Sequence, residues 1–166
     1  MRAGIALGSN LGDRIAHLRT ALEQITRLPM IRPPLLVSSV YETEPVGCAS
    51  DAPSFLNAVI EIDCDRDPAD LLHRLRRIEE AAGRPGKHER NAPRTLDLDL
   101  LYVGDQIVST AGLDLPHPRM IERRFVLEPL AEIRPDLVLP GQTENVAALL
   151  QRLPETTPLV RVPCEW

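Results

Sequence analysis

The sequence predicts an α+β fold of the ferredoxin-like class: a β-α-β-β-α-β core whose antiparallel sheet carries packed helices, followed by C-terminal helical additions. Two periodicities support this prediction, because apolar residues repeat every three or four positions in two long segments and alternate in four short ones. The order of these segments is strand, helix, strand, strand, helix, strand, which is typical of the class. With 166 residues, we expect a single domain over residues 1–166.

The first half of the chain supplies three strands and two helices. Residues 3–8 predict the first strand, and residues 13–28 predict an amphipathic helix in which apolar side chains share one face. Further strands are expected at 36–42 and 55–63, on either side of a long polar loop. Pro68 suits a first helical turn and Gly83 suits a helix end, so a second helix is expected between them.

The second half begins with the segment NAPRTLDLDLLYV, residues 91–103, which predicts the fourth core strand. A turn and a short returning strand are expected at 104–108, and helices at 125–133 and 143–153. Alternation in the fourth strand places leucines at 96, 98 and 100 on one face, toward the helices. Asp97 and Asp99 share the other face, followed by Leu101 and Val103, and we expect that face to carry no helices.

Bulk properties exclude several classes of protein. No apolar run approaches the ~20 residues that a membrane span needs. The three cysteines form no Cys-x-x-Cys pair, so neither a structural zinc site nor a disulfide framework is expected, and a cytoplasmic location follows. The net charge of −5 argues against general nucleic-acid binding, and without an interface signature we expect a monomer.

The aspartate pair carries the strongest functional signal. Two carboxylates on one strand face, ~6.6 Å apart along the chain, repel each other and resist desolvation. They would be stabilised by open water, by pairing with arginine, or by a bound cation. Carboxylate oxygens suit Mg²⁺, which commonly retains waters and substrate phosphates.

A basic segment precedes the pair. Between His73 and Arg94 the chain has seven arginine or lysine residues against three glutamates. Beside paired carboxylates, such a segment suggests a nucleotide triphosphate bound with Mg²⁺, although there is no P-loop motif and LGSNLGD is better explained as a strand-to-helix turn. His117, held between two prolines, is expected to be a second cationic group, and Asn57, unusual within a strand, could recognise a ligand edge.

The motif APRTLDLDLL resembles the signature of the 6-hydroxymethyl-7,8-dihydropterin pyrophosphokinase family. Further similarity along most of the chain lies in ALGSNLGD, SSVYETEPVG, FLNAV, LPHPRM and RRFVLEPLAEI. The resemblance implies a ferredoxin-like domain that binds MgATP and a pterin, with no nucleic-acid or membrane partner. It further implies transfer of the β,γ-pyrophosphoryl group of ATP to the pterin hydroxymethyl oxygen, with release of AMP, in folate biosynthesis.

The resemblance also implies roles for individual residues. Two Mg²⁺ ions would bind Asp97 and Asp99, which with Arg84 and Arg94 form the expected catalytic set. ATP would be contacted by Arg76, Glu79, Arg84, Lys87, Arg94, His117 and Arg123. The pterin would lie between Phe55 and Phe125, hydrogen-bonded by Asn57 and lined by Thr43, Glu44 and Val46.

Two other classes of function are compatible with parts of the pattern. Paired aspartates also serve metal-dependent phosphodiesterases and nucleases, which would act without a pterin. A ferredoxin-like RNA-binding or regulatory module would instead need a basic, aromatic-studded sheet face. The expected sheet face is acidic and poor in aromatic residues, which disfavours the second of these.

Overall fold

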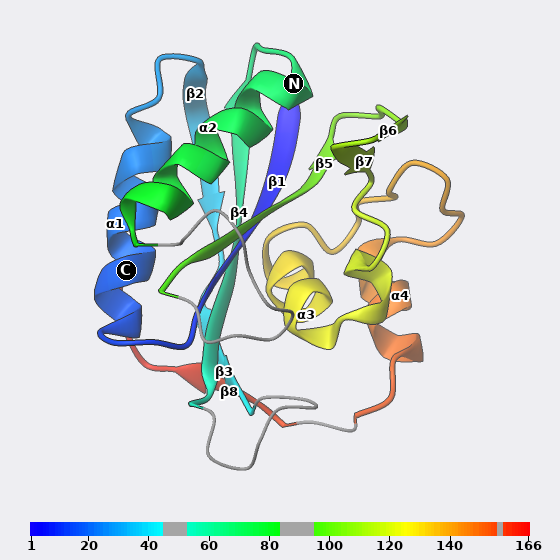
Figure 1. Ribbon diagram of the computed structural model, residues 1–166. Coiled ribbons are helices and arrows are strands. Elements are labelled where there is room, and N and C mark those ends of the chain that lie inside the picture. Colours follow the sequence, from blue (N-terminus) through cyan, green and yellow to red (C-terminus); the bar gives the residue numbers. More distant parts are fainter. Residues whose placement is uncertain (45–52, 84–94, 156–157) are drawn as a thin grey trace.

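The computed structural model describes residues 1–44, 53–83, 95–155 and 158–166. At its centre is one antiparallel sheet whose strands are not in sequence order (Figure 1). Strand order is β5-β1-β4-β3-β8, and β2 also pairs with β4. The strands are β1 (Arg2–Ser9), β2 (Ile31–Val37), β3 (Val40–Thr43), β4 (Phe55–Cys64), β5 (Asp97–Val103) and β8 (Leu159–Val162). The four core strands and two intervening helices follow the ferredoxin-like order, which confirms the predicted fold class.

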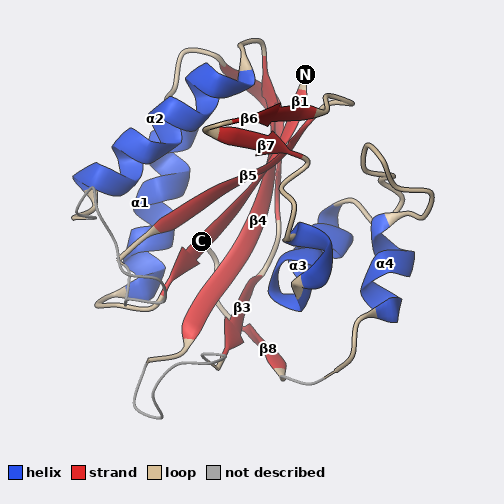
Figure 2. Ribbon diagram, turned by 45° about the vertical axis from the view of Figure 1, so that its right-hand side comes forward, coloured by secondary structure: helices blue, strands red, loops and turns tan. Residues whose placement is uncertain are grey.

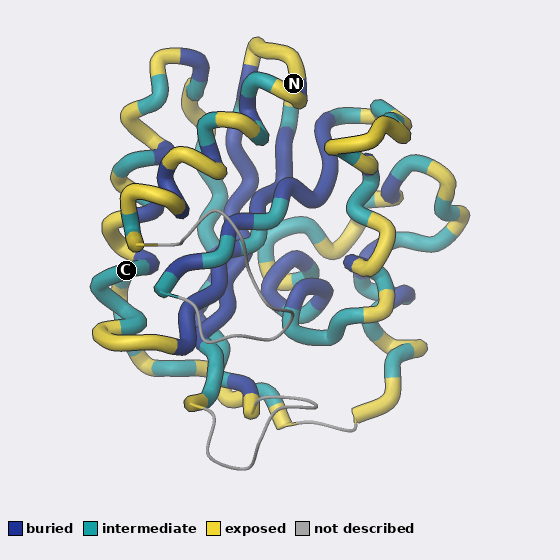
Figure 3. Tube along the Cα trace, viewed as in Figure 1, coloured by how far each residue is buried: buried dark blue, intermediate teal, exposed yellow. Residues whose placement is uncertain are grey.

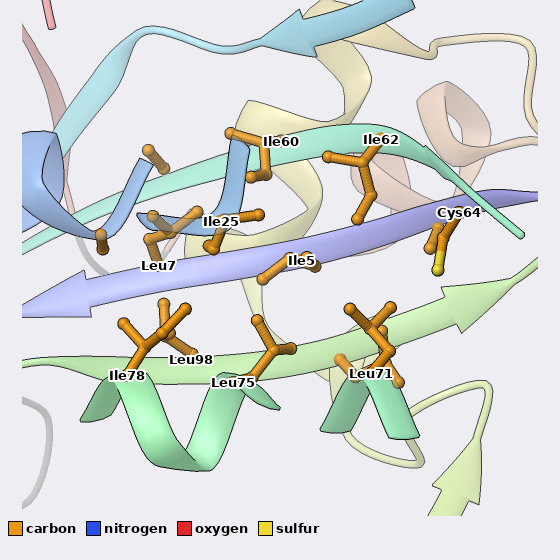
Figure 4. Packing of buried hydrophobic residues seen from close by; sticks show 14 of the residues in the cluster. Ile5, Leu7, Ile25, Ile60, Ile62, Cys64, Leu71, Leu75, Ile78 and Leu98 are labelled. Carbon is orange, nitrogen blue, oxygen red and sulfur yellow. The ribbon is translucent and has the colours of Figure 1, made fainter. Parts of the chain in front are cut away.

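Helices α1 (Arg14–Thr26) and α2 (Pro68–Ala81) cover one face of the sheet (Figure 2). Each is directly preceded by an aspartate whose carboxylate accepts a backbone N–H of the first turn: Asp13 from Ala16, and Asp67 from Ala69. Their apolar stripes pack on the strand residues that alternation directs toward them, including Ile5, Ile60 and Leu98 (Figure 4). Burying this apolar surface is the main stabilising contribution to the fold.

The second face of the sheet also carries helices. Helices α3 (Arg124–Ile133) and α4 (Val146–Arg152) pack there, so the molecule has three layers (Figure 2). Val59, Leu101 and Tyr102 from the strands form a second buried cluster with Leu127 and Leu130 of α3. The expectation that helices lie on one face only was therefore wrong. Helices α3 and α4 each carry apolar side chains that must be buried, and they are buried against this part of the sheet.

A β-bulge in β5 changes which residues share the aspartate face. Leu100 pairs with Ile5 of β1, but the next pair is Tyr102 with Gly4, so Leu101 is an extra residue. Leu101 and Tyr102 both face α3, and Val103 turns back into the core beneath α1 and α2. Leu101 thus lies on the aspartate face as predicted, but the prediction for Val103 was wrong, because the bulge reverses the alternation after Leu101.

The remaining differences concern element boundaries. The strand expected at 36–42 is split at Ser38 and Ser39 into β2 and β3, and β5 begins at Asp97. A hairpin of β6 (Val108–Thr110) and β7 (Leu113–Leu115) follows β5, and a single 3-10 turn, η1 (Met120–Glu122), precedes α3. The C-terminal tail adds β8 alongside β3. Among the described residues no helix is both long and apolar enough to cross a membrane.

Candidate active site

The polar residues of the second sheet face lie in a row across three strands. Gly8 of β1 pairs with Asn57 of β4 on one side and with Asp97 of β5 on the other. One step along the sheet, Ala6 pairs with Asp99. The middle of the sheet is buried (Figure 3), and within this row Gly8 and Asn57 are buried while Asp97 is partly exposed.

Gly8 belongs to strand β1 and not to the turn that follows it. A Cβ built on Gly8 would lie 3.5 Å from Asn57 Oδ1 and 3.9 Å from Asp97 Cβ. The glycine therefore leaves one side-chain position unfilled between an amide and a carboxylate. Explaining LGSNLGD only as a turn missed this residue. The available signal was its place inside a predicted strand, where glycine often marks close approach of a ligand.

Asp97 and Asp99 project from the same face, as alternation predicts, while Leu98 between them is buried in the core. Both aspartates are partly exposed. An Arg123 guanidinium nitrogen, Nη1, lies 3.5 Å from Asp99 Oδ2. Of the three arrangements that could stabilise the pair, arginine pairing is thus present at Asp99. The contact is long, and the partial exposure leaves both carboxylates accessible to a ligand.

Arg123 is held from two sides. It immediately precedes α3, and its guanidinium carbon lies 5.6 Å from the centre of the Phe125 ring, within cation–π range. Phe125 is itself partly buried against the cluster beneath α3. The stacked ring therefore keeps a positive charge beside Asp99 at the start of the helix.

His117 follows the hairpin and is anchored through its backbone and its ring. Its N–H donates to the carbonyl of Leu101 at 2.7 Å, and its Nδ1 accepts the N–H of Arg119 at 3.2 Å. Burial lowers the pKa of His117 below 6.5; the Asp99 carboxylate opposes this shift, while Arg123 and Arg119 add to it. The lowered pKa favours the neutral ring and so disfavours the second cation expected here, and because Nδ1 accepts the Arg119 N–H, the proton of the neutral ring lies on Nε2.

Glu79 supports β5 from the helix layer. This side chain is buried at 5% exposure, and its Oε1 accepts the N–H of Leu98 at 2.7 Å. Because β5 is an edge strand of the sheet that the described residues form, that N–H has no described strand on its outer side. Glu79 thus fixes the backbone between Asp97 and Asp99. Arg76, also expected near ATP, donates to the carbonyl of Gly112 at 3.1 Å.

The residues expected around the pterin gather at the ends of β3 and β4. Thr43 and Asn57 are buried, and Asn57 Nδ2 donates to Thr43 Oγ1 at 2.9 Å. This bond leaves Asn57 Oδ1 toward the unfilled position at Gly8. Phe55 pairs with Thr43 and is partly exposed, and Glu44 is exposed at the end of β3. The remaining expected residues, Val46, Arg84, Lys87 and Arg94, lie outside the described residues.

Together these side chains form a site with two carboxylates, a guanidinium and a neutral imidazole on one side and an amide–hydroxyl pair on the other. Within the described residues no group of three or more histidine, cysteine, aspartate or glutamate side chains could hold a metal ion. Mg²⁺ held by two carboxylates commonly completes its ligand shell with water and substrate phosphates. The site is therefore of the kind found in phosphoryl-transfer enzymes, which work by aligning their substrates and neutralising charge.

Comparison with known proteins identifies the family. Residues 4–135 match the family described as 7,8-dihydro-6-hydroxymethylpterin-pyrophosphokinase (HPPK). The chain belongs to this family, as the resemblance of its motifs indicated.

Individual relatives agree with this assignment. The chain is 44% identical over 139 residues to 2-amino-4-hydroxy-6-hydroxymethyldihydropteridine pyrophosphokinase of Pseudomonas aeruginosa, covering 84% of each chain. It is 46% identical over 134 residues to the Bacillus subtilis protein of the same name, covering 79% of this chain and 77% of that one.

A solved structure shows the same fold. Plasmodium falciparum HPPK-DHPS with pteroate superposes with a TM-score of 0.71 at 13% identity, over 91% of this chain and 42% of that one. The present chain thus spans less than half of that longer protein, and at this identity the likeness concerns the fold alone.

Proposed function

We propose that this chain transfers the β,γ-pyrophosphoryl group of ATP to the hydroxymethyl oxygen of 6-hydroxymethyl-7,8-dihydropterin. The new bond joins that oxygen to the β-phosphorus, the bond from the β-phosphorus to the α,β-bridging oxygen breaks, and AMP leaves. The hydroxyl proton passes to solvent. Membership of the HPPK family supports the reaction, and the observation that carries it within the structure is the row Asn57–Gly8–Asp97 beside Asp99 and Arg123.

The carboxylate pair fits Mg²⁺ by its chemistry, since two partly exposed oxygen donors share one face. Asp97 and Asp99 would hold the two ions that accompany ATP, which would neutralise phosphate charge. Glu79 keeps both aspartates in place through the Leu98 N–H. The two aspartates would thus act as fixed metal ligands and would form no covalent bond to the substrate. This suits a reaction in which alignment and charge neutralisation dominate catalysis.

The cationic and neutral donors would hold the triphosphate. Arg123 presents a guanidinium already stacked on Phe125, so little of its side-chain freedom remains to be lost on binding. The neutral ring of His117 would donate a hydrogen bond through Nε2. Four further residues remain proposed ATP ligands: Arg76, Arg84, Lys87 and Arg94. Separately, we propose that the protein acts as a monomer.

The pterin would lie on the sheet between β1 and β3. Asn57 presents Oδ1 as an acceptor because its amide nitrogen is engaged by Thr43, and the absent side chain of Gly8 leaves space for a flat ring. Phe55 and Phe125 would contact the two faces of the ring, with Glu44 and Val46 completing the wall. An acceptor in this position suits the amino and ring N–H groups of a pterin.

The decisive experiment is incubation of the protein with MgATP and the hydroxymethyl-dihydropterin, followed by chromatography of the products. AMP and the pterin diphosphate should form in equal amounts, and neither should form without the pterin. Production of ADP or inorganic phosphate would overturn the proposal and favour a phosphodiesterase or hydrolase.

Asp97→Ala should lower turnover at least about 100-fold and abolish the magnesium-dependent part of ATP binding, because the ions would lose a ligand. Asp105→Ala is the matched control, since Asp105 is an exposed carboxylate in the turn after β5. A near-normal rate of Asp97→Ala in magnesium would exclude the metal role of this residue.

A further inference from the structure

Three polar side chains join the start of α1 to the ends of β3 and β4. Arg14 Nη1 donates to Glu42 Oε1 at 2.8 Å, to the carbonyl of Ser54 at 2.8 Å and to Ser54 Oγ at 2.9 Å. Ser54 Oγ in turn donates to the same Glu42 oxygen at 2.5 Å. We call these three residues the Arg14 clamp. None of them has a role in the proposed reaction.

The clamp lies on the opposite face of the sheet from the pterin residues. Val40 and Leu56, each two residues from a clamp residue, belong to the core beneath α1 and α2. Alternation therefore directs Glu42 and Ser54 toward α1, and their neighbours Thr43 and Phe55 toward the other face. Glu42 and Ser54 thus each directly precede a residue proposed to contact the pterin.

The local structure shows why a clamp matters here. The register of β3 with β4 comprises three pairs, of which Thr43 with Phe55 is the last. Thr43 is also the last residue of the four-pair ladder of β3 with β8, and terminal pairs of such short ladders open readily because few backbone hydrogen bonds hold them. The side-chain bond from Asn57 to Thr43 spans the same end of the ladder, so opening would also misplace the amide.

The electrostatics favour a closed clamp at neutral pH. The hydrogen bond from Ser54 and then that from Arg14 hold the pKa of Glu42 below its usual value, although burial opposes them. The carboxylate is therefore ionised when it accepts both donors. Such charge-assisted hydrogen bonds are shorter and stronger than neutral ones.

We propose that Arg14 is a positioning residue for the pterin site: by joining Glu42 to Ser54 behind the sheet, it keeps Thr43, Asn57 and Phe55 in register to receive the ring. This inference rests on the proposed function and extends it to a residue that touches neither substrate. It predicts an effect on pterin binding that is separate from nucleotide binding, since the carboxylate pair and Arg123 belong to β5 and to the start of α3.

The test measures two dissociation constants for each variant. Pterin binding is followed by the fluorescence of the pterin in the presence of a non-hydrolysable ATP analogue and Mg²⁺, and binding of the analogue is measured alone by calorimetry. In Arg14→Ala the dissociation constant for the pterin should rise about tenfold, an effect of the size expected for a residue that acts through its neighbours. The dissociation constant for the analogue should stay within about twofold of the wild-type value. Arg14→Lys, which keeps the charge but replaces the planar guanidinium by an ammonium on a flexible stem, should fall between wild type and Arg14→Ala.

Arg27→Ala provides the control. Arg27 directly follows α1 and pairs with Glu23 at 3.5 Å on the exposed surface, so its loss should leave both constants unchanged. A second variant, Glu42→Gln, keeps the acceptor but removes the charge and should weaken pterin binding less than Arg14→Ala. In the double variant the two effects should not add.

The outcomes separate the two proposals. If wild type forms no AMP and pterin diphosphate, the proposed function fails, whatever Arg14 does. If wild type is active but Arg14→Ala binds the pterin normally, or loses pterin and analogue binding equally, the positioning role is excluded. The melting temperature of each variant, measured in parallel, ensures that binding is compared between folded proteins.

Discussion

Gly4 of β1 lies directly beneath the ring of Tyr102, and replacing this glycine by alanine should destabilise the protein strongly. A Cβ on Gly4 would lie 2.2 Å from Tyr102 Cε1, 2.7 Å from Cζ and 2.8 Å from Cδ1. Real Cβ atoms do not approach other atoms this closely, so either the ring or strand β1 must move.

Neither movement is easy. Tyr102 is 1% exposed, and its hydroxyl donates to Glu61 Oε2 at 2.7 Å. Glu61 is fully buried and also accepts from Arg134 Nη1 at 2.9 Å, which ties the end of α3 to the sheet. Displacing the ring therefore overpacks the core and weakens a hydrogen bond to a charged group.

The two contributions set the size of the effect. Overpacking costs about 1–3 kcal/mol, and a hydrogen bond to a charged group contributes about 1.5–3 kcal/mol. Gly4→Ala should thus lower the free energy of unfolding by about 3–5 kcal/mol. At about 2–4 °C per kcal/mol for a domain of this size, the melting temperature should fall by roughly 10 °C.

Urea unfolding followed by circular dichroism provides the measurement. Gly112→Ala is the control, because a Cβ on Gly112 meets nothing within 4 Å, and its effect should be below about 0.5 kcal/mol. Tyr102→Leu removes the overlapping ring atoms, so Gly4→Ala should cost less than about 1 kcal/mol in that background. A cost below about 0.5 kcal/mol for Gly4→Ala in the wild-type background would refute the reasoning.

Three further predictions concern the aromatic residues. Phe55→Ala should weaken pterin binding by about 1–3 kcal/mol, and an unchanged dissociation constant would exclude the stacking role. Burial and then Glu132 raise the pKa of Tyr41 to about 12, and burial and Glu61 raise that of Tyr102, so absorbance at 295 nm should show little phenolate at pH 10.5 in the folded protein. Because unfolded tyrosine ionises near pH 10, stability should fall as pH rises above 10; a tyrosine titrating at pH 10 without unfolding would contradict both shifts. Trp166, the only tryptophan, donates from Nε1 to the Ser38 carbonyl at 2.9 Å. Trp166→Phe keeps a ring but loses this bond, so it should lower the free energy of unfolding in urea by about 1 kcal/mol. An unchanged free energy of unfolding would show that the bond does not stabilise the protein.

Local patterns in the sequence predicted the fold class, both large helices and the aspartate pair. Alternation and helical repeat depend on which face of an element is buried, and that information is written directly into neighbouring residues. Asp97 and Asp99 could be placed on one face because Leu98 and Leu100 occupy the other.

The bulge at Leu101 could not be read in the same way. Residues 100–103 are all apolar, so either face suits each of them, and the reversal depends on pairing with β1. The lowered pKa of His117 likewise depends on burial and on Arg123 and Arg119 around the ring.

By itself, therefore, the sequence determined the order of strands and helices, the acidic face of β5 and the family to which the chain belongs. Only the tertiary structure decided that α3 and α4 cover the second face, that Gly8 separates Asn57 from Asp97, and that Arg14 joins Glu42 to Ser54. The physical reason is that periodicity records the burial of a residue within its own element, whereas these contacts join residues that lie far apart in the chain and meet only when the whole sheet is assembled.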